Sequence, residues 1–105
     1  MAALRLKKFR EFLFDVKLKW YDIGIELEIK QEELDVIKRI NHEDPSACLL
    51  KMIAGWLKST TDEKKAWKTL ADALNSKPVN EKALAAEGIY IFYSKIAINN
   101  NSLSY

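Results

Sequence analysis

The side chains able to act as nucleophile, base or metal ligand in this 105-residue chain are one cysteine, one histidine and a set of carboxylates. Cys48 falls on an apolar stripe with helical spacing, where a small thiol is expected to pack rather than react. His42 is followed by Glu43 and Asp44, but these neighbours lack the i, i+4 spacing that aims ligands at one metal ion. We therefore expect no catalytic residue, no metal site and no cofactor.

The glycines also exclude one class of site. Gly24, Gly55 and Gly88 stand alone, whereas a phosphate-binding loop needs several glycines close together. The chain is accordingly expected to be no enzyme and to have no small-molecule substrate. Because a lone cysteine forms no internal disulfide and no secretory signal is visible, a cytoplasmic location is expected. No run approaches the roughly 20 apolar residues that span a bilayer.

Charge is segregated along the sequence, although the whole chain carries only +2. Residues 1–19 have a net charge of +4 and residues 20–35 a net charge of −5. Opposite patches of this kind can steer one molecule onto another, whereas the alternative is a set of solvated helix faces whose sign is incidental. The candidate acidic partner-binding residues are Asp22, Glu26, Glu32, Glu33 and Asp35. The candidate basic ones in residues 1–19 are Lys7, Lys8 and Arg10.

Helical spacing of apolar residues recurs along most of the chain and predicts an all-helical domain with one core. The central element is the stripe of residues 44–57. The predicted helices are residues 4–16, 20–27, 31–41, 44–57, 62–75 and a short alanine-rich one from residue 80. Gly24 lies on an apolar face, which indicates close passage of another helix there. The predicted core residues are Trp20, Ile23, Leu27, Leu34, Ile37, Cys48, Leu49, Met52, Trp56, Leu57, Trp67, Leu70, Leu74 and Leu84.

Local signals mark several of the helix starts. Asp44 is a good N-cap for the central helix and Pro45 suits its first turn. Thr60 and Glu63 have capping-box spacing, and Asn80 is a candidate cap for the last helix. After residue 89 the composition turns β-branched and aromatic and then polar. This segment either extends the sixth helix, packs as a strand, or is part of a longer protein.

Two function classes fit a helical domain without catalytic groups: an interaction module and a small helical nucleic-acid-binding domain. Lysines in the first 19 residues and in residues 51–68 favour the second class. Phosphates would, however, repel the block of net charge −5, and nucleic-acid binders of this size normally carry a larger basic excess. The charge pattern therefore favours a protein partner over nucleic acid.

An ordered set of motifs over residues 8–89 resembles a death domain, in particular those of large invertebrate receptor-like and adaptor proteins. The motifs are Trp20–Leu27, Leu34–Ile37, Asp44–Ile53 with Trp56-Leu57, Ala66–Leu74, and Leu84-Ala85. The resemblance implies an all-α, six-helix antiparallel Greek-key bundle over residues 4–89, followed by a tail of residues 90–105. It also implies homotypic assembly with other death-domain proteins or with a second copy, in apoptotic or innate-immune signalling.

The resemblance pairs the acidic outer faces of the second and third helices with the basic first and fourth helices of a neighbour. It thereby adds Lys51 and Lys58, on the fourth helix, to the candidate basic residues. One departure lies between the second and third helices. Here the family often has glycine and then a small capping residue, whereas this chain has Glu28 and Lys30. A non-glycine residue in the left-handed conformation costs about 1–2 kcal/mol. We therefore expect either a different turn or a longer second helix.

Overall fold

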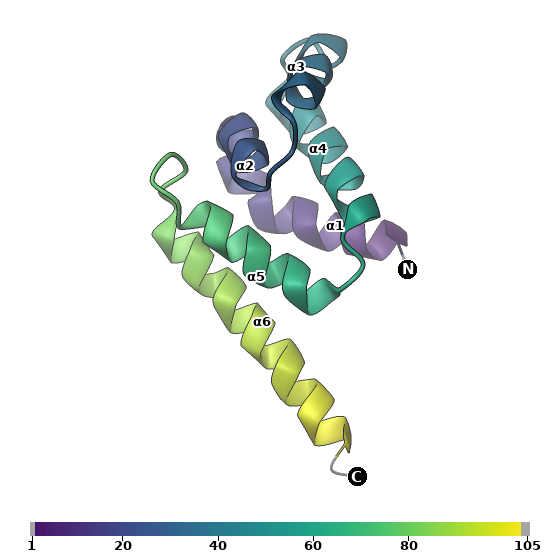
Figure 1. Ribbon diagram of the computed structural model, residues 1–105, viewed down its shortest axis with the longest axis vertical. Helices are drawn as coiled ribbons and strands as arrows, with labels where there is room; N and C mark the ends of the chain where they lie inside the picture. Colours follow the sequence, from purple (N-terminus) through teal and green to yellow (C-terminus); the bar gives the residue numbers. More distant parts are fainter. Residues whose placement is uncertain (1, 104–105) are drawn as a thin grey trace. The chain divides into compact units, whose positions relative to one another are not determined.

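The computed structural model describes the backbone of residues 2–103 and the side chains of residues 4–95, and the regular structure in that range is entirely helical (Figure 1). The chain divides into two compact units, Met1–Ser59 and Thr60–Tyr105, where its length alone suggested one core. The prediction that residues 104 and 105 belong to a tail lies outside the described residues.

The first unit contains four α-helices and one 3₁₀ segment among its described residues. They are α1 (Ala2–Leu13), the 3₁₀ helix η1 (Phe14–Lys19), α2 (Trp20–Glu26), α3 (Gln31–Ile40) and α4 (Pro45–Ser59). The first predicted helix, residues 4–16, was wrong at its end, because α-helical geometry stops at Leu13 and Val16 has non-helical dihedrals. Apolar spacing continues through Val16, so the pattern did not reveal this change of geometry.

Helix α4 is the centre of the first unit, and it packs against α1, α2 and α3. Its predicted N-cap is present, since the Asp44 carboxylate accepts a hydrogen bond from the Ala47 N–H at 2.9 Å. Phe9 from α1 meets Trp56 from α4 edge to face at 5.7 Å between ring centroids. Leu34 from α3 is fully buried. The broad apolar stripe of α4 thus serves three neighbouring helices.

The predicted core residues of this unit are mostly inside it. The buried ones are Trp20, Ile23, Leu27, Leu34, Cys48, Leu49, Met52, Trp56 and Leu57. Ile37 is half-buried, and Ile40, which shares its periodicity, is 64% exposed. Phe9, Leu13 and Ile53 are also fully buried. The inward face of α3 is therefore narrower than its spacing of isoleucines suggests.

Gly24 marks a close helix approach in the first unit, as its place on an apolar face suggested. A β-carbon built there would lie 2.6 Å from Leu34 Cδ2 and 3.2 Å from Met52 Sδ. A β-carbon essentially never lies within 3.0 Å of a non-bonded atom, so a side chain at this residue would force the neighbouring atoms to shift. The absence of a side chain at this residue lets α3 and α4 pack against α2.

Helix α2 ends at Glu26, and a left-handed residue then turns the chain toward α3. That residue is Glu28, with φ of 66°. The Glu28 N–H donates to the Ile25 carbonyl at 3.0 Å and the Ile29 N–H to the Gly24 carbonyl at 3.1 Å, which together form a Schellman motif. Both expectations for this connection, a different turn or a longer second helix, were therefore wrong: α2 is not extended, and the turn is the glycine-favouring type with glutamate at its left-handed position.

The second unit consists of α5 (Glu63–Leu74) and α6 (Lys82–Leu103), which lie side by side (Figure 1). The predicted core residues Trp67, Leu70 and Leu74 are buried on α5, and Leu84 is half-buried on α6. Val79, in the connection between the helices, is fully buried although no helical pattern includes it. A loop residue thus contributes to the core.

The two capping residues predicted in this unit were wrong. The N-cap of α5 is Asp62, whose carboxylate accepts from the Lys64 and Lys65 N–H groups, so Thr60 does not cap it. Helix α6 starts at Lys82, and Asn80 lies before it with a left-handed φ of 51°. Asp62 caps α5 because it lies nearer the first turn than Thr60 does. Asn80 does not cap α6 because it belongs to a left-handed turn before that helix.

The sixth helix is also longer than predicted. It runs through Leu103, so the first of the three alternatives for the segment after residue 89 is the observed one. The boundary that we predicted between residues 89 and 90 falls inside this helix. Lys95 Nζ lies 3.4 Å from Glu63 Oε2, which aligns Lys95 with the first residue of α5. Beyond Lys95, α6 extends past the start of α5 (Figure 1).

Candidate interaction surface

The predicted acidic residues lie on α2 and α3, two helices that pack together in the first unit. Asp22, Glu32 and Glu33 are exposed, and Glu26 is half-buried. None of these four carboxylates forms an ion pair with another residue whose side chain is described. Their charge is therefore available to a partner.

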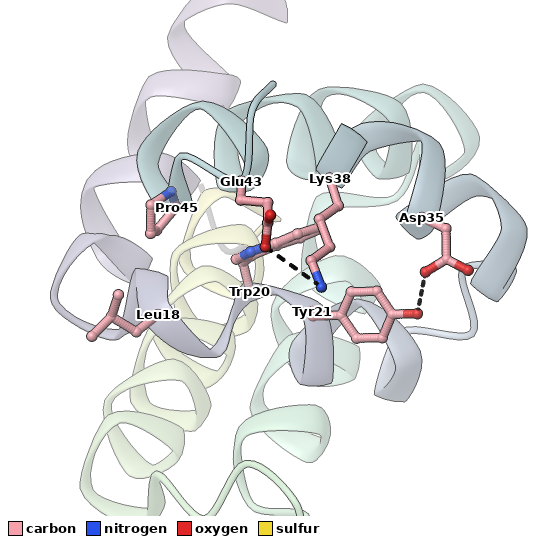
Figure 2. A pocket seen from close by; sticks show the side chains of 7 residues that line it. All are labelled: Leu18, Trp20, Tyr21, Asp35, Lys38, Glu43 and Pro45. Atoms are coloured by element: carbon pink, nitrogen blue, oxygen red, sulfur yellow. Dashed lines mark hydrogen bonds and ion pairs between the residues drawn. The ribbon is translucent and has the colours of Figure 1, made fainter. Parts of the chain in front are cut away.

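Asp35 differs from the other acidic residues because it already has a hydrogen-bond partner. Tyr21 Oη donates to Asp35 Oδ1 at 2.6 Å, joining α2 to α3 (Figure 2). This hydrogen bond, with a smaller contribution from desolvation, raises the pKa of the Tyr21 phenol above its usual value. Asp35 thus positions α3 against α2 and presents only part of its carboxylate to a partner.

A pocket of about 500 Å³ opens beside this hydrogen bond. Figure 2 shows the side chains that line it, from η1, α2, α3, the connection after α3 and the start of α4. They are Leu18, Trp20, Tyr21, Asp35, Lys38, Glu43 and Pro45. Lys38 Nζ lies 3.8 Å from Glu43 Oε1, and both side chains are exposed. The pocket thus combines an apolar wall with a polar wall on one side of the acidic surface.

The connection after α3 positions Glu43 at this pocket. His42 and Glu43 are both left-handed, with φ of 53° and 60°. The Glu43 N–H donates to the Lys38 carbonyl at 2.9 Å, and the His42 N–H donates to the Arg39 carbonyl at 3.2 Å. This second Schellman motif brings Glu43 back alongside Lys38. His42 is exposed, and its left-handed backbone forms part of this turn.

The predicted basic residues come from two helices of the same unit. Lys7, Lys8 and Arg10 are exposed on α1, and Lys51 and Lys58 are exposed on α4. As with the carboxylates, none of the five forms an ion pair within the described side chains. The sequence analysis assigned them to the first and fourth helices, and the structure likewise has an α1 group and an α4 group.

Lys51 was assigned to the basic group, but it lies near Glu33, one of the acidic residues of α3. A groove of about 400 Å³ is lined by residues of the α2–α3 turn, α3 and α4, and both Glu33 and Lys51 contribute to it. Lys30 and Glu28 line the same groove. Acidic and basic side chains therefore line this groove together. The exposed bases of α1 form the more uniformly positive group.

The one cysteine lies in the core of the first unit rather than on the charged surface. Cys48 is fully buried, and its Sγ lies 3.8 Å from the Ile37 carbonyl to which it donates. Burial, with smaller contributions from Asp44 and Glu43, raises the pKa of the Cys48 thiol. Among the described residues, no three His, Cys, Asp or Glu side chains converge as metal ligands. Cys48 is therefore a packing residue.

Sequence reasoning missed Leu18, Tyr21, Lys38 and Pro45 as surface features. Leu18 is 79% exposed between two lysines, and an isolated leucine in that context is the one signal that was available. Tyr21 and Asp35 are brought together only by the turn between α2 and α3, so no local spacing connects them. The pocket is a product of tertiary structure.

Comparisons with protein-family models, with curated proteins and with solved structures find no match for this chain. Within residues 2–103, none of the helices combines the length and the apolar character needed to cross a bilayer.

Proposed function

We propose that this chain is a non-enzymatic interaction module of the death-domain type, which assembles in the cytoplasm with other death domains or with a second copy of itself. The proposed fold is the six-helix antiparallel Greek-key bundle that the sequence motifs imply. The proposed setting is apoptotic or innate-immune signalling. The ordered motifs support this proposal together with the all-helical structure.

The observation that carries the proposed mechanism is the exposed acidic surface of α2 and α3. Glu32 and Glu33 occupy the first turn of α3, where carboxylates also stabilise the positive end of the helix dipole. Both remain exposed and without an ion-pair partner among the described side chains. The exposed bases of α1, Lys7, Lys8 and Arg10, have the complementary charge. Charge complementarity of this kind raises association rates and orients the partner.

The test is reversal of the acidic charge in the variant Glu32→Lys/Glu33→Lys. Binding is measured by pull-down with purified death domains and with a differently tagged copy of the chain. The expected result is a loss of binding of at least tenfold, with unchanged helicity by circular dichroism. A matched control is Glu11→Lys/Asp15→Lys, which changes net charge equally at two exposed residues next to the basic group. This control should bind as well as the parent chain or better.

Binding that is unaffected by Glu32→Lys/Glu33→Lys would contradict the charge-pairing mechanism. Equal losses in the variant and the control would show a response to net charge and would also contradict it.

A further inference from the structure

Helix α6 has two apolar faces, and α5 covers only one of them. On the covered face Ala85 and Gly88 are buried, and Leu84, Ile91 and Phe92 are half-buried. The opposite face presents Ala83, Ala86, Tyr90 and Tyr93, all of them exposed. Tyr90 is 74% exposed and Tyr93 is 61% exposed. A helix that is apolar on both sides is normally buried on both sides.

The exposed residues follow a regular spacing. Ala83, Ala86, Tyr90 and Tyr93, which we call the α6 seam, are separated by three, four and three residues. This is the alternation of positions a and d in the seven-residue repeat of a coiled coil. Lys82 then falls at position g and Glu87 at position e, and both are exposed. These are the positions that flank the contact between two paired helices.

We propose that the α6 seam is a self-association surface, on which α6 of a second copy of this chain packs in parallel. The small side chains of Ala83 and Ala86 allow the two helices to approach closely at one end. Tyr90 and Tyr93 supply aromatic area at the other, with their hydroxyl groups at the wet edge. The occupant is thus a helix with the same seam.

The flanking charges argue for a second copy and for the parallel orientation. In a parallel pair, position g of one helix faces position e of the next heptad on the other helix. Lys82 of each copy therefore faces Glu87 of the other, which gives two opposite-charge pairs by symmetry. In an antiparallel pair centred on the seam, the two Glu87 side chains would lie near each other across the axis. Like charges so placed are destabilising.

This surface lies in the second unit and goes beyond the proposed function, which rests on α1, α2 and α3. The seam is also tested in the Glu32→Lys/Glu33→Lys background, so that its readout does not depend on the acidic surface. Sedimentation equilibrium over a concentration series gives the dissociation constant of the self-associated form. The parent chain is expected to show reversible dimerisation in both backgrounds.

The first test variant is Tyr90→Lys/Tyr93→Glu, which keeps the net charge and good helix formers on an exposed face. It should raise the dissociation constant at least tenfold while leaving helicity unchanged. The matched control is Ile40→Lys/Leu4→Glu, since Ile40 and Leu4 are exposed apolar residues of the first unit. The control should dimerise like the parent. A chain that stays monomeric, or a dimer indifferent to Tyr90→Lys/Tyr93→Glu, would overturn the proposal.

The second test uses charge exchange to fix the orientation. Lys82→Glu alone and Glu87→Lys alone each place like charges across a parallel pair, so each should raise the dissociation constant about two- to fivefold. An equimolar mixture of the two single variants should restore parent-like association, because each copy then carries the complement of the other. A mixture no tighter than either variant by itself would overturn the parallel pairing.

Discussion

At the scale of single residues, the two glycines of the first unit show how surroundings decide the effect of one methyl group. Gly24 and Gly55 both lie inside helices, where glycine is about 1 kcal/mol less favourable than alanine. Around Gly24 the space is filled by Leu34 and Met52, whereas nothing lies within 4 Å of a β-carbon built at Gly55. The same substitution should therefore have opposite signs at the two residues.

We predict that Gly24→Ala destabilises the protein by about 1–3 kcal/mol, because overpacking a filled core outweighs the gain in helix propensity. Gly55→Ala, the matched control, should stabilise it by roughly 0.5–1 kcal/mol. Urea denaturation followed by circular dichroism measures both changes. A stabilising Gly24→Ala would mean that Leu34 has room to move and that α2 and α3 pack more loosely than described.

At the scale of helices, the caps decide where each element begins, and they are the least visible feature in the sequence. Asp44 was identifiable because proline follows it at the first helical residue. Before α5, Thr60 and Asp62 both precede the helix and both have capping side chains. The structure selects Asp62, whose carboxylate accepts from two N–H groups at 3.1 Å and 3.3 Å.

We predict that Asp62→Ala lowers the free energy of unfolding by about 1 kcal/mol, because it leaves N–H groups of the first turn of α5 without a partner. Thr60→Ala, at the residue favoured by the capping-box spacing, should change it by less than about 0.5 kcal/mol. Thermal and urea unfolding of the two variants under the same buffer conditions provide the comparison. Equal losses in both variants would restore a capping role to Thr60.

The helices themselves were predictable from apolar spacing wherever one face is buried. The bounds of α2, α3 and α4 fall within two residues of the predicted ones. Spacing failed where it continued across a change of geometry, as after Leu13, and where composition misled, as in the β-branched segment of α6. Local signals also missed the left-handed Glu28, because a Schellman turn normally selects glycine at that residue.

The candidate surface was predictable only in part, for a related reason. Exposed charges are identified by their absence from the apolar stripe, so the positions of Glu32, Glu33, Lys7 and Lys8 followed from the sequence. The hydrogen bond from Tyr21 to Asp35 and the presence of Lys51 beside Glu33 depend on how helices pack. These contacts join residues far apart in the chain, and no local pattern encodes them.

At the scale of the whole molecule, charge is balanced within each unit but segregated within the first. The acidic α2 and α3 and the basic α1 belong to that unit, whereas the α6 seam belongs to the other. The two proposed surfaces also differ in physical character. One relies on exposed charges, and the other buries two alanines and two tyrosines per copy with a single charged residue on each flank. Salt should therefore separate them.

Exposed charges are screened over a length that falls from about 10 Å at 0.1 M salt to about 3 Å at 1 M. We predict that raising salt from 0.1 M to 1 M weakens binding of partner death domains at least fivefold, a change measured by titration calorimetry or sedimentation. Glu32→Lys/Glu33→Lys should have a much flatter salt dependence, because the attracting charges are gone.

Dimerisation through the α6 seam should change by less than about threefold over the same range, since burial of apolar area does not depend on charge and salt even strengthens it modestly. The matched measurement is dimerisation in the Glu32→Lys/Glu33→Lys background, where the acidic surface no longer contributes. Dimerisation that falls as steeply with salt as partner binding would assign self-association to the charged surface of the first unit instead. Partner binding whose affinity does not change with salt would contradict the role proposed for Glu32 and Glu33, because an interface held by pairing of exposed charges is weakened by salt.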